Sequence, residues 1–183
     1  MVLPMFRSLA VPHTRAIFSS ARALPCSAPN QMNAVRLQST SAKSWQTGKL
    51  NHVAIAVPDL EQASQFWRDT MGAKSVSEPV PQPEHGVYTV FVVLGDGAKI
   101  ELIHPYGDKS PIANFLAKNP SGGIHHICVE TDKIDNAIKE LPENGIRLLA
   151  KESKIGAHGN PVVFMHPKDT NGVLTELEET KNF

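Results

Sequence analysis

The first 58 residues of this 183-residue chain contain no aspartate or glutamate, although the whole sequence has 18 acidic residues. This segment is rich in Ser, Ala and Pro, and polar residues interrupt every apolar stretch that might serve as a secretory signal. Residues 1–43 are therefore predicted to be a mitochondrial transit peptide and lead-in, with processing near Ser39 and a matrix location for the mature protein. The alternative is a basic tail without a targeting role. The basic residues of this segment are Arg7, Arg15, Arg22, Arg36 and Lys43.

Cysteine and long apolar runs are scarce in the rest of the chain. Only Cys128 lies in the body, because Cys26 falls in the predicted presequence, so the mature chain cannot form an internal disulfide. No apolar run approaches the roughly 20 residues of a membrane span. After residue 43, 18 acidic residues face 13 Lys and Arg, a net charge of about −5 that gives no reason to bind nucleic acid. Walker loops and dinucleotide-binding fingerprints are also absent.

What the body does contain is one order of elements, strand–helix–strand–strand–strand, present twice. Its first half begins with a strand of alternating pattern that is rich in β-branched residues. A helix follows, which Asp59 is expected to cap and Gly72 to end. A helix at residues 110–119 is expected to connect the two halves. The first half is expected to have its elements at residues 50–57, 59–71, 73–77, 87–94 and 98–104, with a loop at 78–86. The second half is expected to have them at residues 123–130, 132–143, 146–150, 161–166 and 173–178.

Each half has one apolar sheet face, which it can bury only by pairing with the other half. We therefore predict an α+β fold made of two tandem βαβββ modules, residues 48–119 and 121–180, that form one domain over residues 48–180. Their strands would make a curved eight-stranded cup around a metal site, with the helices outside. Asp132 is expected to cap the second helix, and Pro142 to end it early or kink it.

Two histidine–glutamate pairs occupy equivalent places in the two halves. His52 and His126 lie in the first strands, 74 residues apart, and Glu101 and Glu176 lie in the last strands, 75 residues apart. Side chains alternate along a strand, so each histidine shares its strand face with small neighbours that leave room for a ligand. The four side chains are predicted to converge in the cup.

Two imidazoles and two carboxylates form a mixed ligand set that suits Co²⁺, Mn²⁺, Fe²⁺ or Zn²⁺. A single strand histidine is more often a hydrogen-bonded core residue, whereas a glutamate in an apolar strand is costly to bury unpaired. The duplicated placement is what favours a metal. His125 is expected to face away from His126, and Cys128 is expected to be a small buried apolar residue. The remaining histidines carry weaker signals: His85, His104, His158 and His166.

Five motifs resemble the methylmalonyl-CoA epimerase family, and the similarity spans residues 48–178. This family belongs to the vicinal oxygen chelate superfamily, with glyoxalase I and the extradiol dioxygenases. The resemblance implies interconversion of (R)- and (S)-methylmalonyl-CoA in propionyl-CoA catabolism, through an enolate that a metal stabilises between bases on opposite faces. The motifs are LNHVAIAVPD (50–59), GGIHHI (122–127), KIGAHG (154–159), FMHPK (164–168) and GVLTEL (172–177).

The resemblance also implies individual roles. It makes His52, Glu101, His126 and Glu176 metal ligands, favours Co²⁺ as the metal, and makes Glu176 a base as well. Its substrate would be an acyl-CoA, and relatives of this fold often form homodimers.

The second base is left open by this resemblance. Thr89 stands where some bacterial members have a second acidic residue, and Glu101 stands where some members have glutamine. Glu101 is therefore taken as the second base, with Glu84 as the alternative.

Two other functions remain as alternatives. A glyoxalase I-like isomerase would also use metal-stabilised enolisation, but its ligand set often assembles across a dimer interface. A metal-free small-molecule binding protein of the same fold would bury four ionisable groups without a partner for their charge. A dioxygenase is less favoured, since it would use two histidines and one carboxylate.

Overall fold

A computed structural model describes residues 43–181 of the chain, so the predicted transit peptide and its processing site near Ser39 lie outside the described residues. Among those residues, nine strands form one sheet in the order β2-β4-β5-β1-β6-β9-β8-β7, and β3 also pairs with β4. The strands are β1 (Thr47–Ala56), β2 (Ser75–Val76), β3 (Val80–Gln82), β4 (Val87–Val93), β5 (Lys99–Pro105), β6 (Gly123–Thr131), β7 (Lys154–Ile155), β8 (Pro161–Met165) and β9 (Thr175–Glu179). The helices are α1 (Leu60–Gln65) with its wider continuation η1 (Phe66–Thr70), α2 (Ala113–Lys118), α3 (Ile134–Glu143) and the short η2 (Pro167–Asp169).

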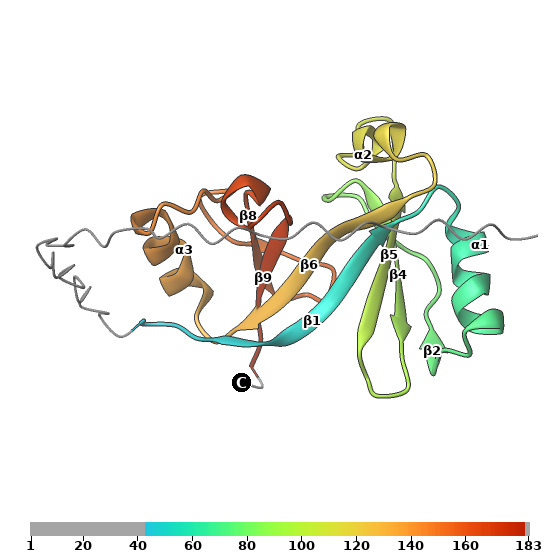
Figure 1. Ribbon diagram of the computed structural model, residues 1–183, viewed down its shortest axis with the longest axis horizontal. Helices are drawn as coiled ribbons and strands as arrows, with labels where there is room; N and C mark the ends of the chain where they lie inside the picture. Colours follow the sequence, from blue (N-terminus) through green and yellow to red (C-terminus); the bar gives the residue numbers. More distant parts are fainter. Residues whose placement is uncertain (1–42, 182–183) are drawn as a thin grey trace, which may run out of the picture. The chain divides into compact units, whose positions relative to one another are not determined.

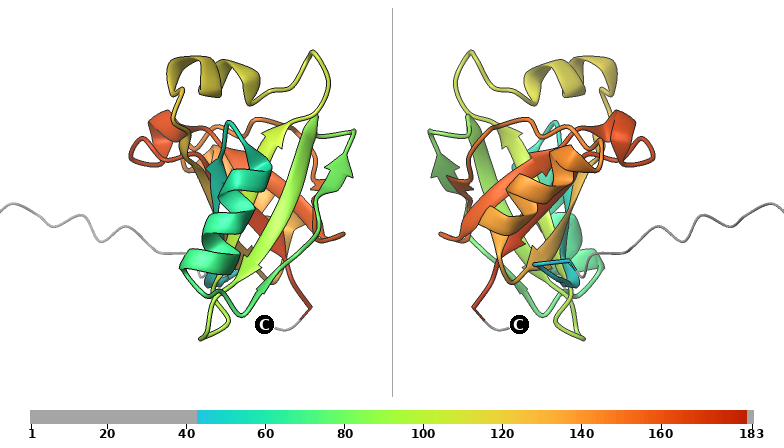
Figure 2. Two further views of the ribbon diagram at one scale, coloured as in Figure 1. Left: turned by 90° about the vertical axis from the view of Figure 1, so that its right-hand side faces the viewer. Right: turned by 90° about the vertical axis from the view of Figure 1, so that its left-hand side faces the viewer.

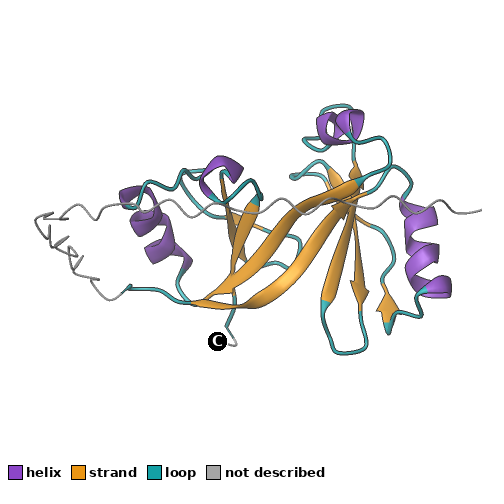
Figure 3. Ribbon diagram, in the orientation of Figure 1, coloured by secondary structure: helices purple, strands orange, loops and turns teal. Residues whose placement is uncertain are grey.

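Two long strands, β1 and β6, run antiparallel at the centre of the sheet (Figure 1). On its other side β1 pairs in parallel with β5, and β6 pairs in parallel with β9. The two halves of the sheet thus repeat one arrangement in opposite directions, with α1 beside one half and α3 beside the other (Figure 3). The predicted fold class, two βαβββ units forming one curved sheet, is confirmed. The division at residues 48–119 and 121–180 stays a prediction.

Helix α1 covers the outer face of the first half (Figure 2, left). Val90 and Val92 of β4 and Leu102 of β5 pack beneath it and are at most 1% exposed. Because side chains alternate along a strand, their neighbours Thr89 and Glu101 point to the opposite face, inside the cup. The apolar core under α1 therefore determines which polar groups face inward.

Helix α3 covers the second half in the same way (Figure 2, right). Its buried residues Ile134, Ala137 and Leu141 pack against Val163 of β8 and Leu177 of β9. Every helix in the described part of the chain falls short of the length and apolarity that a bilayer crossing requires.

The two long helices begin differently. Asp59 caps α1 as predicted, since its Oδ1 accepts a hydrogen bond from the backbone N–H of Gln62 at 2.9 Å. The predicted cap of α3 at Asp132 is wrong, because that carboxylate accepts from the backbone N–H of Gln46 instead. The first N–H of α3, at Ile134, donates to Glu179 of β9 at 2.7 Å. A carboxylate from the neighbouring strand thus replaces the local cap.

The later elements of the second half depart from expectation. Pro142 lies in the last turn of α3, which continues to Glu143 rather than ending early. The predicted strand at 146–150 is reduced to one bridge, Leu148 to Met165, and β7 forms a few residues later. In the first half, β3 forms inside the predicted loop at 78–86.

Candidate metal and catalytic site

The four predicted ligand residues lie on the inner face of the sheet and are each 3–6% exposed. On β1 and β5, Ala54 pairs with Glu101 two residues after His52. On β6 and β9, Cys128 pairs with Glu176 two residues after His126. The equivalent register places each carboxylate diagonally across from its own histidine. The antiparallel register of β1 and β6 then brings the two pairs together, because His52 pairs with Cys128 and His126 with Ala54.

The side-chain tips converge on one point. His52 Nε2 lies 3.3 Å from Glu101 Oε2 and 3.6 Å from Glu176 Oε2. His126 Nε2 lies 3.5 Å from the first oxygen and 3.4 Å from the second. The ligand atoms of His52, His126 and Glu176 all lie within 4.8 Å of one another. The structure therefore brings together all four residues singled out in the sequence.

The residues present fit a divalent metal ion. Ligand atoms about 2.0–2.2 Å from one ion lie roughly 3.0–3.5 Å apart, close to the N–O separations found here. His52 Nε2 and His126 Nε2 are buried and have no hydrogen-bond partner among residues 43–181. Unpartnered buried nitrogens are costly, and two buried carboxylates need positive charge nearby. A bound cation would satisfy both requirements.

The Glu101 carboxyl is held in its charged form. Burial alone would raise its pKa, but the imidazole of His52, 3.3 Å away, and the charges of His126 and His158 outweigh it, so the pKa is lowered. A carboxylate that stays ionised is the form that binds a metal.

Each of the two histidines follows a bulge in its strand. The register of β1 and β6 shifts at Asn51 and again at His125, so each of these residues is the extra residue of a β-bulge and has no partner on the other strand. The side chain of each then turns toward the next residue. Asn51 Oδ1 lies 3.0 Å from His52 Nδ1, and His125 Nδ1 lies 3.0 Å from His126 Nδ1. With Nδ1 engaged in this way, each imidazole presents Nε2 to the site.

The expectation that His125 faces away from His126 is therefore wrong, because the bulge breaks the alternation on which it depended. Burial, followed by the charge of His126, lowers the pKa of His125 to about 4 although Glu101 opposes the shift, so its ring is neutral at physiological pH. A neutral ring can accept a hydrogen bond from the Nδ1–H of His126.

The other bulge residue, Asn51 on β1, is itself held in place, since its amide donates a hydrogen bond to Glu130 at 2.9 Å.

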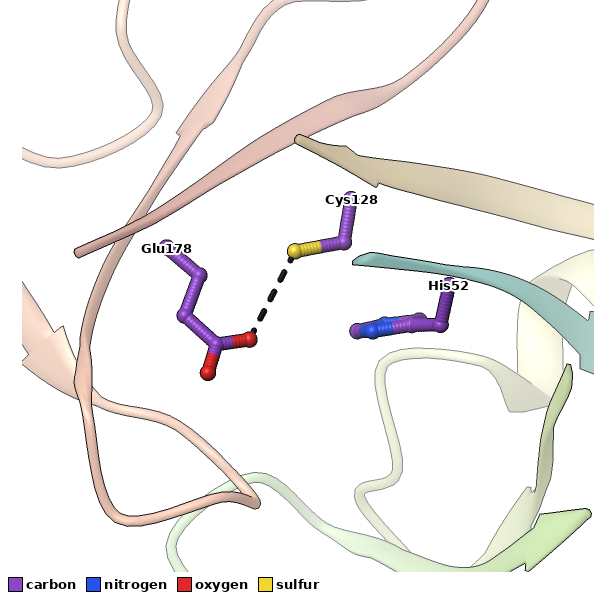
Figure 4. A group of neighbouring side chains, drawn as sticks. All are labelled: His52, Cys128 and Glu178. Atoms are coloured by element: carbon purple, nitrogen blue, oxygen red, sulfur yellow. Dashed lines mark hydrogen bonds between the residues drawn. The ribbon is translucent and has the colours of Figure 1, made fainter. Parts of the chain in front are cut away.

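A second cluster, His52, Cys128 and Glu178, adjoins the first (Figure 4). The Cys128 thiol donates to Glu178 Oε2 at 3.6 Å. Burial, with Glu176 and Glu178 nearby, raises the pKa of the thiol. The raised pKa keeps Cys128 as a thiol that donates to Glu178. Cys128 acts as a small buried residue, as predicted.

The four candidate ligand residues line a cavity of about 360 Å³, within the size range of small-molecule sites. Thr89 also lines it, and its buried hydroxyl has no partner in the described part of the chain. Glu84, the alternative second base, is exposed and lines a separate hollow beside Tyr106 and Lys109. Its position gives no support to a role at the four-residue cluster.

Sequence reasoning gave no role at the cluster to four residues that lie around it: Asn51, His125, His158 and Glu178. Glu178 could have been found, since it alternates with Glu176 and so shares its strand face. His158 lies in the Gly-rich loop before β8 and its position depends on tertiary contacts. The two bulge residues could not be found, because a bulge has no reliable signature in a single sequence.

Comparison with known proteins agrees with this fold. Residues 51–164 match the model of the glyoxalase/bleomycin resistance protein/dioxygenase superfamily. The curled sheet built from two βαβββ units has the fold of this superfamily, and the four candidate ligand residues face its interior.

Within that class the similarity is more specific. A mitochondrial methylmalonyl-CoA epimerase from Mus musculus is 59% identical over 139 residues, 76% of this chain and 77% of the relative. An ethylmalonyl-CoA/methylmalonyl-CoA epimerase from Cereibacter sphaeroides is 58% identical over 72% of this chain and 98% of the relative. A Streptomyces coelicolor methylmalonyl-CoA epimerase variant, solved with 2-nitronate-propionyl-CoA, has a TM-score of 0.67 and 32% identity, covering 74% of this chain and 99% of that one. The chain belongs to the methylmalonyl-CoA epimerase family.

Proposed function

We propose that the chain interconverts the (R) and (S) forms of methylmalonyl-CoA by moving the proton on C2. The observation that carries this proposal is the cluster of four buried ligand residues in a cavity of about 360 Å³. The family relationship supplies the substrate class. The cavity has room for the acyl group and the start of the thioester chain, while the nucleotide end of coenzyme A would extend outside.

His52, Glu101, His126 and Glu176 would hold one divalent metal ion. When bound, the ion supplies Lewis-acid stabilisation of the negative charge that develops on the carboxylate and thioester oxygens as C2 loses its proton. The chain's own residues prepare this arrangement. The side chains of Asn51 and His125 orient the two imidazoles, and burial excludes water that would weaken the electrostatic interactions. Co²⁺ remains the favoured metal.

Glu176 is assigned a second role, as the base on one face of the substrate. A carboxylate near C2 can take the proton, hold it while the enolate persists, and return one to the same face. Inversion needs another group on the opposite face. Thr89 has no acid–base capacity at neutral pH, although its unpartnered hydroxyl can donate a hydrogen bond to a substrate oxygen.

The test is solvent-deuterium incorporation at C2 of methylmalonyl-CoA in heavy water, starting from each stereoisomer and with or without a chelator. The proposal expects incorporation from both isomers and its loss on chelation, with recovery when Co²⁺ is restored. A glyoxalase-type isomerase would leave this substrate unlabelled. Incorporation unaffected by complete metal removal would contradict the metal's role.

We also propose a mitochondrial matrix location, supported by the acid-free basic segment and by the mitochondrial relative. Mass spectrometry of the protein from its own cells should find an amino terminus within a few residues of Ser39. An intact Met1 in a folded cytosolic pool would contradict this location. Homodimer formation stays a prediction.

A further inference from the structure

His158 and Glu178 form a polar pair on the wall of the same cavity, and the function proposed above uses neither residue. His158 lies in the loop between β7 and β8, and Glu178 lies on β9. Glu178 Oε2 accepts a hydrogen bond from His158 Nδ1 at 3.1 Å. Asn160 donates to the other oxygen, Oε1, at 2.7 Å. Glu178 is only 2% exposed, so this carboxylate is buried and held from both sides.

The carboxylate determines which ring nitrogen of His158 is basic. An ionised carboxylate only accepts hydrogen bonds, so His158 carries its proton on Nδ1 and keeps a lone pair on Nε2. Nε2 lies 3.2 Å from Lys99 Nζ, and an ammonium group only donates. The same order of groups, a carboxylate at Nδ1 and the basic lone pair on Nε2, orients the general base in many hydrolases.

His158 also lies against β4, the strand from which Thr89 faces the cavity. Its ring stacks on Phe91 of β4, with centroids 4.3 Å apart and planes 27° apart. Phe91 and Thr89 are two residues apart on β4 and so share a face. Thr89 lines the cavity there, and its hydroxyl has no acid–base capacity at neutral pH. The ring centroid of His158 is also 5.5 Å from that of His52, beside the four-residue cluster.

We propose that His158 is the second proton-transfer group, acting on the face of C2 opposite Glu176, with Glu178 as its positioning residue. This assignment rests on the function proposed above. In one direction neutral His158 takes the C2 proton: the C–H bond breaks, the Nε2–H bond forms, and the electron pair passes into the enolate. Glu176 in its acid form then returns a proton to the other face. In the reverse direction the two groups exchange roles.

Lys99 completes this arrangement. Its half-buried ammonium donates to Nε2 in the structure, and its flexible side chain can move aside when a substrate C–H takes that place. Afterwards it can pass protons between the imidazole and solvent, which restores the starting protonation states. The buried Glu178 carboxylate offsets the positive charge that His158 gains during turnover.

The experiment follows deuterium uptake from each stereoisomer separately in the wild-type and His158→Gln proteins, both loaded with Co²⁺. Glutamine retains polarity but has no acid–base group. In the variant, the isomer whose C2 proton faces Glu176 should still exchange with retention of configuration. Exchange from the other isomer, and interconversion of the two, should fall by ~10²-fold or more. Metal content should equal that of the wild type.

Two further variants sharpen the test. Glu178→Gln preserves an acceptor for Nδ1 but removes the charge, so it should reproduce the same one-isomer defect with a smaller loss. His166→Gln changes an imidazole that caps η2 and should leave both exchange rates unchanged. Equal loss from both isomers in His158→Gln, or no loss from either, would overturn the assignment. Absence of exchange in the wild type would instead overturn the proposed function, and this assignment with it.

Discussion

The imidazoles of His52 and His126 meet edge to face, with ring centroids 5.5 Å apart and planes at 74°. Both Nε2 atoms are buried without a hydrogen-bond partner among the described residues. The two rings come from the antiparallel central strands, where each histidine pairs with a small residue of the other strand. A shared cation would supply the partner that both nitrogens lack.

The first prediction concerns metal content. His52→Ala and His126→Ala should each bind far less metal than the wild type, because each removes one ligand and leaves the carboxylates without that partner. Metal analysis after dialysis against a weak chelator measures the loss. His166→Ala is the matched control, since that histidine lies at η2. Full metal content in either ligand variant would show that the cluster is not the site.

The second prediction concerns the bulge residues. His125→Ala and Asn51→Ala should weaken metal affinity about 10–100-fold, less than loss of a ligand, because each removes the group that holds Nδ1 of a histidine. Competition with a metal-binding dye measures the affinity. Wild-type metal affinity in both variants would mean that Asn51 and His125 do not orient the imidazoles of His52 and His126.

The third prediction separates ligand from base. Glu176→Gln keeps an oxygen ligand but loses the basic carboxylate, so metal should be partly retained while exchange at C2 falls by ~10²-fold or more. Glu101→Gln also keeps an oxygen ligand, and it should keep substantial exchange from both stereoisomers, since Glu101 acts only as a ligand in this scheme. A one-isomer defect in Glu101→Gln would restore Glu101 as the second base and argue against His158.

The fourth prediction concerns the turn before β6. Gly122 has φ +80°, and a Cβ there would overlap the carbonyl oxygen of Ala56. Gly145 has the same φ, but no described atom lies within 4 Å of its Cβ position. Gly145→Ala should therefore cost about 1–2 kcal/mol from backbone strain alone, and Gly122→Ala should cost clearly more. Denaturant unfolding measures the free energy of unfolding of both variants. Equal losses of stability would show that the overlap with Ala56 has no effect.

The fifth prediction is a pH dependence of stability outside the site. Hydrogen bonds from the side chain and backbone of Arg147 hold the pKa of Asp169 well below its usual range. A depressed carboxyl pKa stabilises the fold above the unfolded pKa of about 3.9, and this contribution is lost as the pH falls toward the folded value. Asp169→Asn should thus lower the Tm at pH 7, and the difference should shrink below about pH 4. A difference independent of pH would point to lost packing instead.

Periodicity and spacing were enough to predict the sheet, its two equivalent halves and the four residues of the cluster. His52, Glu101, His126 and Glu176 alternate with apolar residues that a helix must cover, so burial of the apolar face turns them inward. This information is local to each strand and repeats along the chain.

Tertiary structure decided the rest. The inward turn of His125 depends on a bulge that arises only when β1 and β6 pair. Glu179, rather than Asp132, caps α3 because β9 lies beside that helix. His158 reaches the cavity only because its loop folds back over Phe91 and Glu178. Such contacts join residues far apart in the sequence, and no pattern within a single strand or helix encodes which distant partner will meet it.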